Sequence, residues 1–142
     1  MEYEYTSTDD VQVQDLSQTD EIPPDLGMQA IDDALDAQEI RVKIWYFQEG
    51  EEIAYHAHSE QEELFYVLEG EFSLKLGRSG EADYVEATEG DFWVAAPMIG
   101  HGHRCTSDDG GRVLALGAPP THNPGLNPHD LSDEKIDAAI EN

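Results

Sequence analysis

The sequence has one cysteine and no long hydrophobic run, and both absences narrow the class of protein. Because Cys105 is the single cysteine among 142 residues, no disulfide can form within the chain, and a reducing compartment fits. No apolar run approaches the roughly 20 residues that a helix needs to cross a bilayer. The first ten residues, MEYEYTSTDD, lack the basic and apolar segments of a signal peptide. We therefore expect a soluble, cytoplasmic, single-domain protein that buries a core without disulfides.

Basic residues are also scarce, with 7 Lys and Arg against 32 Asp and Glu and a formal net charge of -25. Such a surface repels nucleic acid and anionic membranes, so we expect neither as a partner. Residues 1–40 hold twelve acids and no base, but acids continue at high density through the rest of the chain. This pattern favours a protein adapted to molar salt, from a halophilic archaeon, over an ordinary acidic cytosolic protein.

The first forty residues differ from the rest in composition and in the pattern of their apolar residues. Residues 1–27 are acidic and polar, with Pro23, Pro24 and Gly27 as breaks, and indicate a poorly ordered or draped arm. Residues 28–36, MQAIDDALD, have the apolar spacing of a short helix.

From residue 40 the pattern is that of β-structure. The segment IRVKIWYFQ at 40–48 is rich in β-branched and aromatic residues and alternates apolar with basic residues. Glycine-containing turns separate it from further candidate strands at 53–58, 63–68, 71–76, 82–87, 91–96, 101–106 and 112–117. Many short strands at this spacing predict an antiparallel sandwich or barrel.

The chain ends in an irregular loop and a helix. The segment 117–130 holds four prolines and cannot be regular. Ser132 is a good N-cap for the segment LSDEKIDAAIEN, and its first acids suit the positive end of a helix dipole.

Two pairs of histidines carry the candidate chemistry. His56 and His58 point to one face of a strand, where they could share a metal ion with a carboxylate from the next strand. The alternative is that both histidines lie on a solvent-exposed face, with Glu60, Glu62 and Glu63 exposed on the surface. His101 and His103 form a second pair with the same spacing.

The segment around the first pair resembles the first sequence motif of the cupin superfamily. That motif is a glycine, five residues, His-x-His, three or four residues, a glutamate, six residues and a glycine. It is satisfied at every position by Gly50, His56, His58, Glu63 and Gly70.

The second motif is matched less cleanly. Gly90, Pro97, Gly100 and His103 correspond to it, but the proline falls one residue late and Ser107 stands where asparagine is usual. Measured from Gly90, His103 matches the small cupins that end in Gly-His-x-His-Arg, which favours His103 over His101.

The resemblance implies an all-β protein built on one cupin barrel, which is a double-stranded β-helix or jelly roll. We expect an acidic arm at 1–39 with a possible short helix, the barrel at 40–118, and a proline-rich loop and helix at 119–142. The resemblance also implies a ligand set for one divalent transition metal ion per chain, of the kind Fe, Mn, Ni, Zn or Cu: His56, His58, Glu63 and His103.

Function is less determined, since a fold and a metal do not fix a reaction. One hypothesis is a metal-dependent enzyme, an oxygenase or isomerase, acting on a small molecule, with His101 moving a proton. The other is a non-catalytic module that binds a metal or small ligand, with His101 at the rim or behind the ligands. Cys105 is expected to be a small buried residue. We also expect a homodimer, with the strand at 40–48 as the contact.

The first prediction concerns salt. Carboxylates repel one another at low ionic strength and screening relieves that repulsion, so the melting temperature should be higher in about 2 M than in about 0.1 M KCl. Thermal melts followed by circular dichroism measure this. A flat or falling melting temperature would mean that the acidity serves another purpose.

Overall fold

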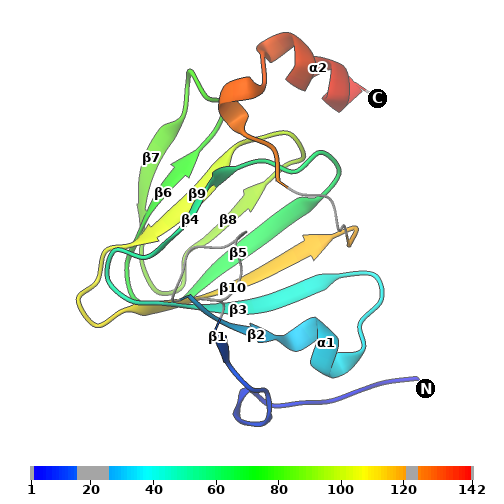
Figure 1. Cartoon of the computed structure of the whole chain (residues 1–142), viewed down its shortest axis with the longest axis vertical. Coiled ribbons are helices and arrows are strands. Elements are labelled where there is room, and N and C mark those ends of the chain that lie inside the picture. The colour runs from blue at the N-terminus through cyan, green and yellow to red at the C-terminus, as the bar shows by residue number, and fades with distance from the viewer. Residues whose placement is uncertain (1, 16–25, 121–124, 142) are drawn as a thin grey trace.

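The structure is a computed structural model that describes residues 2–15, 26–120 and 125–141 (Figure 1). The Pro23–Pro24 pair lies outside the described residues. Most of the regular secondary structure in the described chain is β-strand, which confirms the expected all-β class. The elements, in chain order, are the 3-10 turn Thr8–Asp10, β1 (Gln14–Asp15), β2 (Gly27–Ala30), α1 (Ile31–Leu35), β3 (Arg41–Phe47), β4 (Glu52–His56), β5 (Glu62–Glu69), β6 (Phe72–Leu76), β7 (Asp83–Ala87), β8 (Phe92–Ala95), β9 (His101–Cys105), β10 (Gly111–Ala118), the 3-10 turn Pro128–Asp130 and α2 (Asp133–Glu141).

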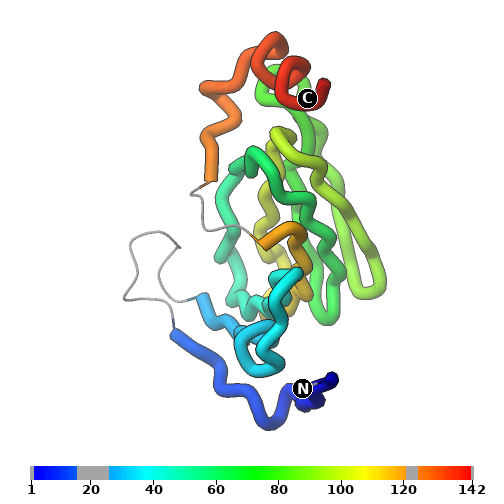
Figure 2. The backbone as a smooth tube through the Cα atoms, turned by 90° about the vertical axis from the view of Figure 1, so that its right-hand side faces the viewer, coloured from blue at the N-terminus to red at the C-terminus, as the bar shows by residue number. Residues whose placement is uncertain are grey.

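The eight strands expected from residue 40 onward are all present, with ends shifted by at most two residues. Together with β1 and β2 they form two antiparallel sheets, which we call sheet A, in the order β1-β2-β3-β10-β5-β8, and sheet B, in the order β4-β9-β6-β7. The two sheets face each other across a core (Figures 1 and 2). The core is built from the inward side chains of both sheets, among them Phe47, Phe65, Phe72 and Trp93.

The segment before residue 40 is part of sheet A. Residues 28–30, expected to begin a helix, instead pair with β3 as strand β2, and the helix α1 starts at Ile31. Because an open strand edge offers unpaired N–H and C=O groups, pairing outweighs a weak helical pattern over three residues. The described part of the arm is held in place: the buried Gln29 amide donates to the carbonyls of Thr8 and Val11 at 3.0 and 2.9 Å.

Gly70 shows why the first motif ends in a glycine. Its φ of +93° lies in the left-handed region that favours glycine. A Cβ at this position would also lie 2.6 Å from the carbonyl oxygen of Gly110. The turn from β5 to β6 therefore requires glycine for both conformation and space.

The C-terminal helix is confirmed at Asp133–Glu141. Ser132 caps it as expected, since its hydroxyl accepts a hydrogen bond from the Lys135 N–H at 3.2 Å. Arg78, in the turn between β6 and β7, binds Asp133 and Asp137 of the helix at 3.1 and 2.7 Å. No helix among residues 2–15, 26–120 and 125–141 has the length and apolar character needed to cross a membrane.

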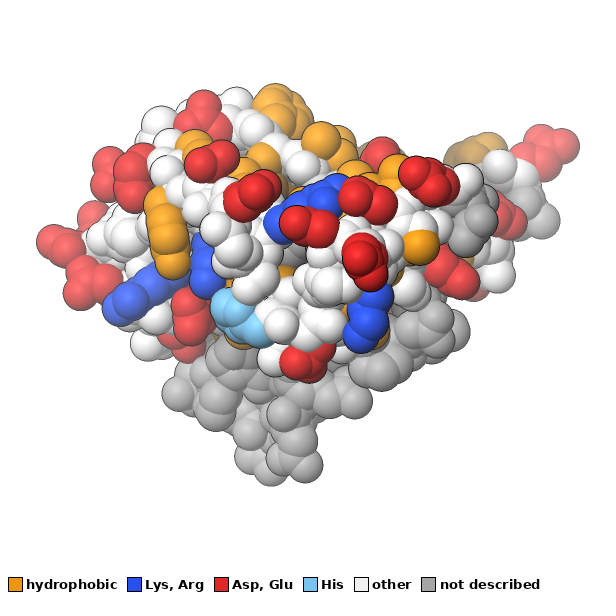
Figure 3. Space-filling view, turned by 90° about the horizontal axis from the view of Figure 1, so that it is seen from above, with side chains coloured by type: hydrophobic (Ala, Val, Ile, Leu, Met, Phe, Trp, Pro, Cys, Tyr) orange, Lys and Arg blue, Asp and Glu red, His pale blue; other side chains and the backbone are white. Residues whose placement is uncertain are grey.

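Charge is spread over the surface rather than gathered in one segment. Viewed from the end that carries α2, acidic side chains are scattered over the face of the molecule and basic ones are few (Figure 3). The acidity of the sequence is thus a property of the folded surface, the arrangement on which the predicted effect of salt depends.

Candidate metal centre

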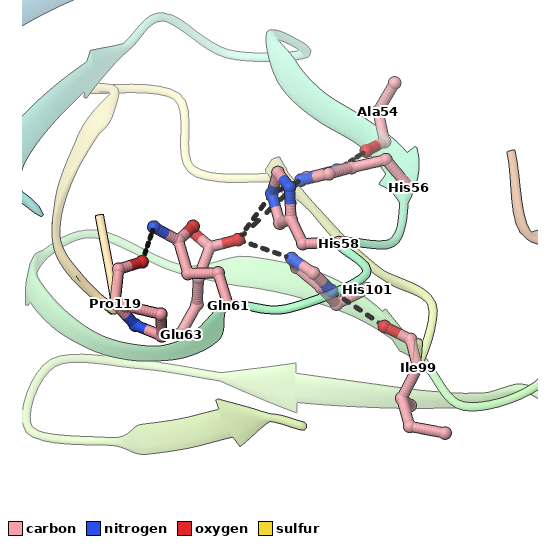
Figure 4. A network of polar contacts seen from close by, with 8 residues as sticks. All are labelled: Ala54, His56, His58, Gln61, Glu63, Ile99, His101 and Pro119. Atoms are coloured by element: carbon pink, nitrogen blue, oxygen red, sulfur yellow. Dashed lines mark hydrogen bonds and ion pairs between the residues drawn. The ribbon is translucent and has the colours of Figure 1, made fainter. Parts of the chain in front are cut away.

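Four of the side chains singled out in the sequence meet between the two sheets: His56, His58, Glu63 and His101 (Figure 4). His56 is the last residue of β4 and lies opposite His101, the first residue of β9, in sheet B. His58 follows β4 by two residues, and Glu63 comes from β5 of sheet A. One ligand atom from each of the four lies within 4.8 Å of all the others. The group therefore forms only because the sheets close on each other.

The distances within this group fit a metal ion. Oε1 of Glu63 lies 2.8 Å from Nε2 of His58 and 3.0 Å from Nε2 of His101. The Nε2 atoms of His56 and His58 are 3.1 Å apart. Neighbouring ligands of a six-coordinate ion with bonds of about 2.1 Å lie about 3.0 Å from one another. The donor set, three imidazole nitrogens and a carboxylate oxygen, also suits a divalent transition metal.

Backbone carbonyls orient two of the rings. Nδ1 of His56 donates to the carbonyl of Ala54 at 2.7 Å, and Nδ1 of His101 donates to the carbonyl of Ile99 at 3.0 Å (Figure 4). A carbonyl only accepts, so the proton sits on Nδ1 and the neutral ring presents a lone pair at Nε2. A second partner of this kind is what metal-binding histidines commonly have.

The lone pairs at Nε2 of these rings point toward other hydrogen-bond acceptors. Nε2 of His101 lies 3.0 Å from Oε1 of the Glu63 carboxylate. Two acceptors at this distance repel unless a proton or a cation lies between them. A metal ion among the four side chains would relieve this repulsion, and the residues present therefore fit one.

The protonation states suit metal binding as well. Burial lowers the pKa of His56 to about 4, assisted by the nearby His101 and opposed by the hydrogen bond to Ala54. Burial alone would raise the pKa of Glu63, but the adjacent His101 and His58 side chains outweigh it and hold the pKa well below its usual range. At neutral pH His56 is therefore neutral and Glu63 ionised, as metal ligands must be.

At the fourth position the structure differs from the sequence-based expectation, because it brings His101 and not His103 to the other three. His103 also points inward, but it pairs with Leu74 one strand step deeper and lies among aromatic rings. Its ring centroid is 5.2 Å from that of Phe65, 5.3 Å from Trp93 and 5.4 Å from Phe47. Neither ring nitrogen has a hydrogen-bond partner among the described residues, and burial lowers the pKa of His103 to about 3.

Spacing could not separate the two histidines because residues two apart share a face of a strand. The signal lies in the turn before β9. Met98 takes a left-handed φ of +72°, and its N–H donates to the carbonyl of His58 at 2.7 Å. This hydrogen bond joins the turn that contains Pro97 to the segment of the first motif. The strand that follows, β9, begins with His101, which lies opposite His56.

The remaining candidates lie outside the group. Cys105 is 1% exposed within the core, at the depth of Phe72. Glu60 and Glu62 are exposed, in contrast to Glu63. The position of Glu62 agrees with the alternation of faces along a strand.

Comparison with known proteins identifies the family. The model of the cupin domain matches residues 43–117, more than half of the chain. This chain therefore belongs to the cupin family. No curated protein matches the sequence.

Solved structures of cupins share the fold over most of the chain. An RmlC-like cupin from Shewanella frigidimarina is 22% identical, with a TM-score of 0.66 over 86% of this chain and 97% of its own. KdgF from Halomonas sp. is 21% identical, with a TM-score of 0.66 over 83% and 96%. A Thermotoga maritima protein described as a predicted oxalate decarboxylase is 16% identical, with a TM-score of 0.68 over 82% and 100%. At these identities the likeness establishes the fold alone.

The second prediction tests the fourth residue of the site. His101→Ala should lower the metal content to background, since it removes a direct ligand. His103→Leu should keep the metal. It should also fold at least as stably as the parent, because it removes two buried nitrogens without hydrogen-bond partners, and each unsatisfied buried group costs about 1–3 kcal/mol. Elemental analysis of protein purified without added metal, beside chemical denaturation, gives both readouts.

The unmutated protein and a His56→Ala/His58→Ala variant provide the controls. Circular dichroism shows whether each variant is folded. If folded His103→Leu loses the metal while His101→Ala keeps it, the ligand set contains His103. Equal metal in the parent and the double variant would mean that the cluster binds none.

Proposed function

We propose that this cupin is a metal-dependent enzyme that acts on a small molecule, with one divalent transition metal ion held by His56, His58, Glu63 and His101. The observation that carries the proposal is the convergence of three imidazoles and one ionised carboxylate whose nearest separations are 2.8–3.1 Å. A partly buried cluster of this kind costs folding free energy, and such clusters gather at functional sites.

The residues of the chain supply position and charge. Ala54 and Ile99 hold the His56 and His101 rings through their carbonyls, so that Nε2 of each ring faces the centre. Glu63 contributes a negative charge that offsets part of the charge of a divalent ion. A six-coordinate ion with four protein ligands keeps up to two positions for water, oxygen or substrate. The bound metal would supply a Lewis acid or an oxygen-activating centre.

Among reaction classes we favour an oxygenase or an isomerase. The name of the Thermotoga maritima neighbour points to a small carboxylic acid, and a structure from Acidithiobacillus ferrooxidans, 23% identical with a TM-score of 0.60, is described as that of a "putative sugar phosphate isomerase". Those names belong to distant neighbours, so they only indicate which substrates to test first.

The second candidate is a non-catalytic module that binds a metal or a small ligand. One observation favours it: both nitrogens of His101 are engaged, one by the Ile99 carbonyl and one by Glu63. As a ligand, His101 has no nitrogen left to move a proton, so the geometry favours the ligand role over the acid–base role expected from sequence. A reaction at this site would then take its proton-transfer group from the substrate, from solvent or from a released ligand.

The acidic surface supports a salt-adapted protein of the cytoplasm of a halophilic archaeon. The support is the net charge of -25 with acids along the whole chain. Melting experiments in low and high KCl test this part of the proposal separately from the chemistry.

The third prediction separates enzyme from binding module. Protein loaded in turn with Fe, Mn, Ni, Zn or Cu is incubated with small acids, diketones, thiols and sugars, and oxygen uptake and products are measured. An enzyme should show turnover that depends on one metal and falls to background in Glu63→Gln, because the charged ligand is lost. Glu60→Gln, which changes an exposed neighbouring acid, should retain it.

The same samples are followed by thermal shift. A ligand that stabilises the metal-loaded parent but not Glu63→Gln, with no product from any substrate in the series, would favour the binding module. Turnover that survives in Glu63→Gln would contradict both candidates at this site.

A further inference from the structure

Residues 125–141, which we call the C-terminal segment, begin beside two of the metal ligands. Leu126 and Ala57 form an antiparallel bridge: the Leu126 N–H donates to the Ala57 carbonyl at 2.7 Å, and the Ala57 N–H donates to the Leu126 carbonyl at 2.9 Å. Ala57 is fully buried and lies in the chain between His56 and His58. The C-terminal segment therefore binds both backbone polar groups of the residue that separates two ligands.

This bridge closes an edge of sheet B. β4 is the first strand of that sheet, so only β9 pairs with it. Beyond the end of β4, the N–H and the carbonyl of Ala57 need partners from elsewhere, because unpaired backbone groups are costly to bury. At the next residue, the Met98 N–H donates to the His58 carbonyl at 2.7 Å. The backbone of the two ligands is thus held by two contacts, and one of them comes from the C-terminal segment.

The segment also packs on a ligand ring. A Cβ at Gly125 would lie 3.4 Å from Cδ2 of His56 and 3.7 Å from the Ala57 carbonyl oxygen, which is van der Waals contact. His56 and His58 are the outer ligands, since their side chains are 25% and 17% exposed against 2% for His101. The C-terminal segment therefore lies at the solvent-facing side of the cluster, where the ligands have the most freedom to move.

Local sequence stiffens the segment between this bridge and the helix α2. Pro128 has a fixed φ, and Oδ1 of Asn127 accepts a hydrogen bond from the His129 N–H at 3.0 Å, which starts a 3-10 turn. The His129 ring packs on Tyr55, the residue before the first ligand, with 5.7 Å between ring centroids. A displacement of the helix is therefore transmitted to the end of β4 rather than absorbed in a loose loop.

α2, at the top of Figure 1, fixes the other end of the segment. Its side chain Ile136 is buried and only 1% exposed. In the turn between β6 and β7, Arg78 binds two aspartates of the helix, and Oγ of Ser79 lies 2.5 Å from Nδ1 of His129. Because exposed ion pairs contribute little, the burial of Ile136 supplies most of the docking. The segment thus joins the β6–β7 turn to the metal ligands.

We propose that docking of the C-terminal segment positions the outer ligands of the metal centre, so that docking and metal binding strengthen each other. This inference rests on the metal site of the proposed function, and it makes Leu126 and Ile136 positioning residues that act through the backbone. With the segment docked, the Nε2 atoms of the two outer ligands lie 3.1 Å apart. With the segment released, Ala57 loses both hydrogen bonds, and the ion itself must order the two ligands, which lowers its affinity.

The alternative is a segment that only stabilises the fold. A tail of this kind would raise the free energy of unfolding without changing the arrangement of the ligands. Coupling differs because it is reciprocal: the factor that docking adds to metal affinity is also the factor that the metal adds to docking. Metal affinity and opening of the segment are therefore measured in the same variants.

The test compares two isoleucines one turn apart on α2 in the full-length protein. Ile136→Glu places a charge at the 1% exposed position and should release the segment, whereas Ile140→Glu alters a side chain that is already 56% exposed. The dissociation constant for Zn²⁺, measured by competition with a chelator, should rise roughly 10-fold in Ile136→Glu, within the range of coupled sites. In Ile140→Glu it should stay within about twofold of the parent.

Two further readouts separate positioning from general stability. The visible absorption of the Co²⁺-loaded protein reports the geometry of the ligands, and it should change in Ile136→Glu but not in Ile140→Glu. Hydrogen exchange of the backbone amides of residues 126–141 should be slower in the Zn²⁺-loaded parent than in the metal-free parent, by about the factor that docking adds to affinity. In His56→Ala/His58→Ala, Zn²⁺ should leave that exchange unchanged.

A charge reversal releases the helix without altering the core. Arg78→Glu faces Asp133 and Asp137 with a like charge and should also weaken Zn²⁺ binding. Adding Asp137→Arg should recover part of the loss. Circular dichroism shows whether each variant is folded, and this pair decides the matter if Ile136→Glu does not fold.

Unchanged Zn²⁺ affinity and an unchanged Co²⁺ spectrum in the folded Ile136→Glu and Arg78→Glu variants overturn the inference and leave the metal site in place. Exchange in the segment that Zn²⁺ does not slow overturns it as well. A parent that binds neither ion overturns the proposed function itself, so the two failures are distinguished.

Discussion

The contact between Glu63 and His101, which spans 3.0 Å between the two sheets, requires the sheets to be held at one spacing. The rings beneath it set that spacing. Phe65, two residues after Glu63, stacks on Trp93 with 5.0 Å between ring centroids and lies 5.7 Å from the ring of His101. Because protein interiors are close-packed, a change of volume in this layer moves the ligand atoms above it. The geometry of the candidate centre is therefore a property of the aromatic core as much as of the ligands.

The same closure determines where charge can be buried. Glu63 is largely removed from solvent beside histidines that offset the cost of its burial, whereas Glu60 and Glu62 are exposed. Two carboxylates in the barrel would repel each other and one would take up a proton. An otherwise acidic protein therefore brings one glutamate to the cluster and exposes its neighbours. By contrast, the outer face of sheet A carries the uncharged pairs Leu64–Val94 and Tyr66–Phe92.

The strands and the first half of the site could be read from sequence because both depend on local alternation. Predicting that two histidines two residues apart and a glutamate on the next strand face inward requires only the alternation of faces along a strand. It does not require knowing how deep in the barrel each side chain lies. The helix expected from Met28 was wrong for its first three residues because pairing with β3 is a long-range contact. The pairing of Tyr66 with Phe92 on the outer face of sheet A likewise depends on a register that local sequence does not give.

Depth is the property that spacing could not supply, and it separates His101 from His103. Both share the inner face of β9, so a slip of two residues would keep every side chain on its face and put His103 in the place of His101. The observed register puts His101 opposite His56 and Leu76, and His103 opposite Ile53 and Leu74. In the deeper position the ring has no polar partner among the described residues, and its low pKa keeps it neutral among the aromatic side chains. The ring then packs among the aromatic rings, and an edge contact of an aromatic pair is worth about 0.5–1.5 kcal/mol. An unsatisfied buried polar group costs about 1–3 kcal/mol. Packing alone does not repay that cost, so the preference for this register has to come from the shallower position, where His101 completes the cluster around Glu63.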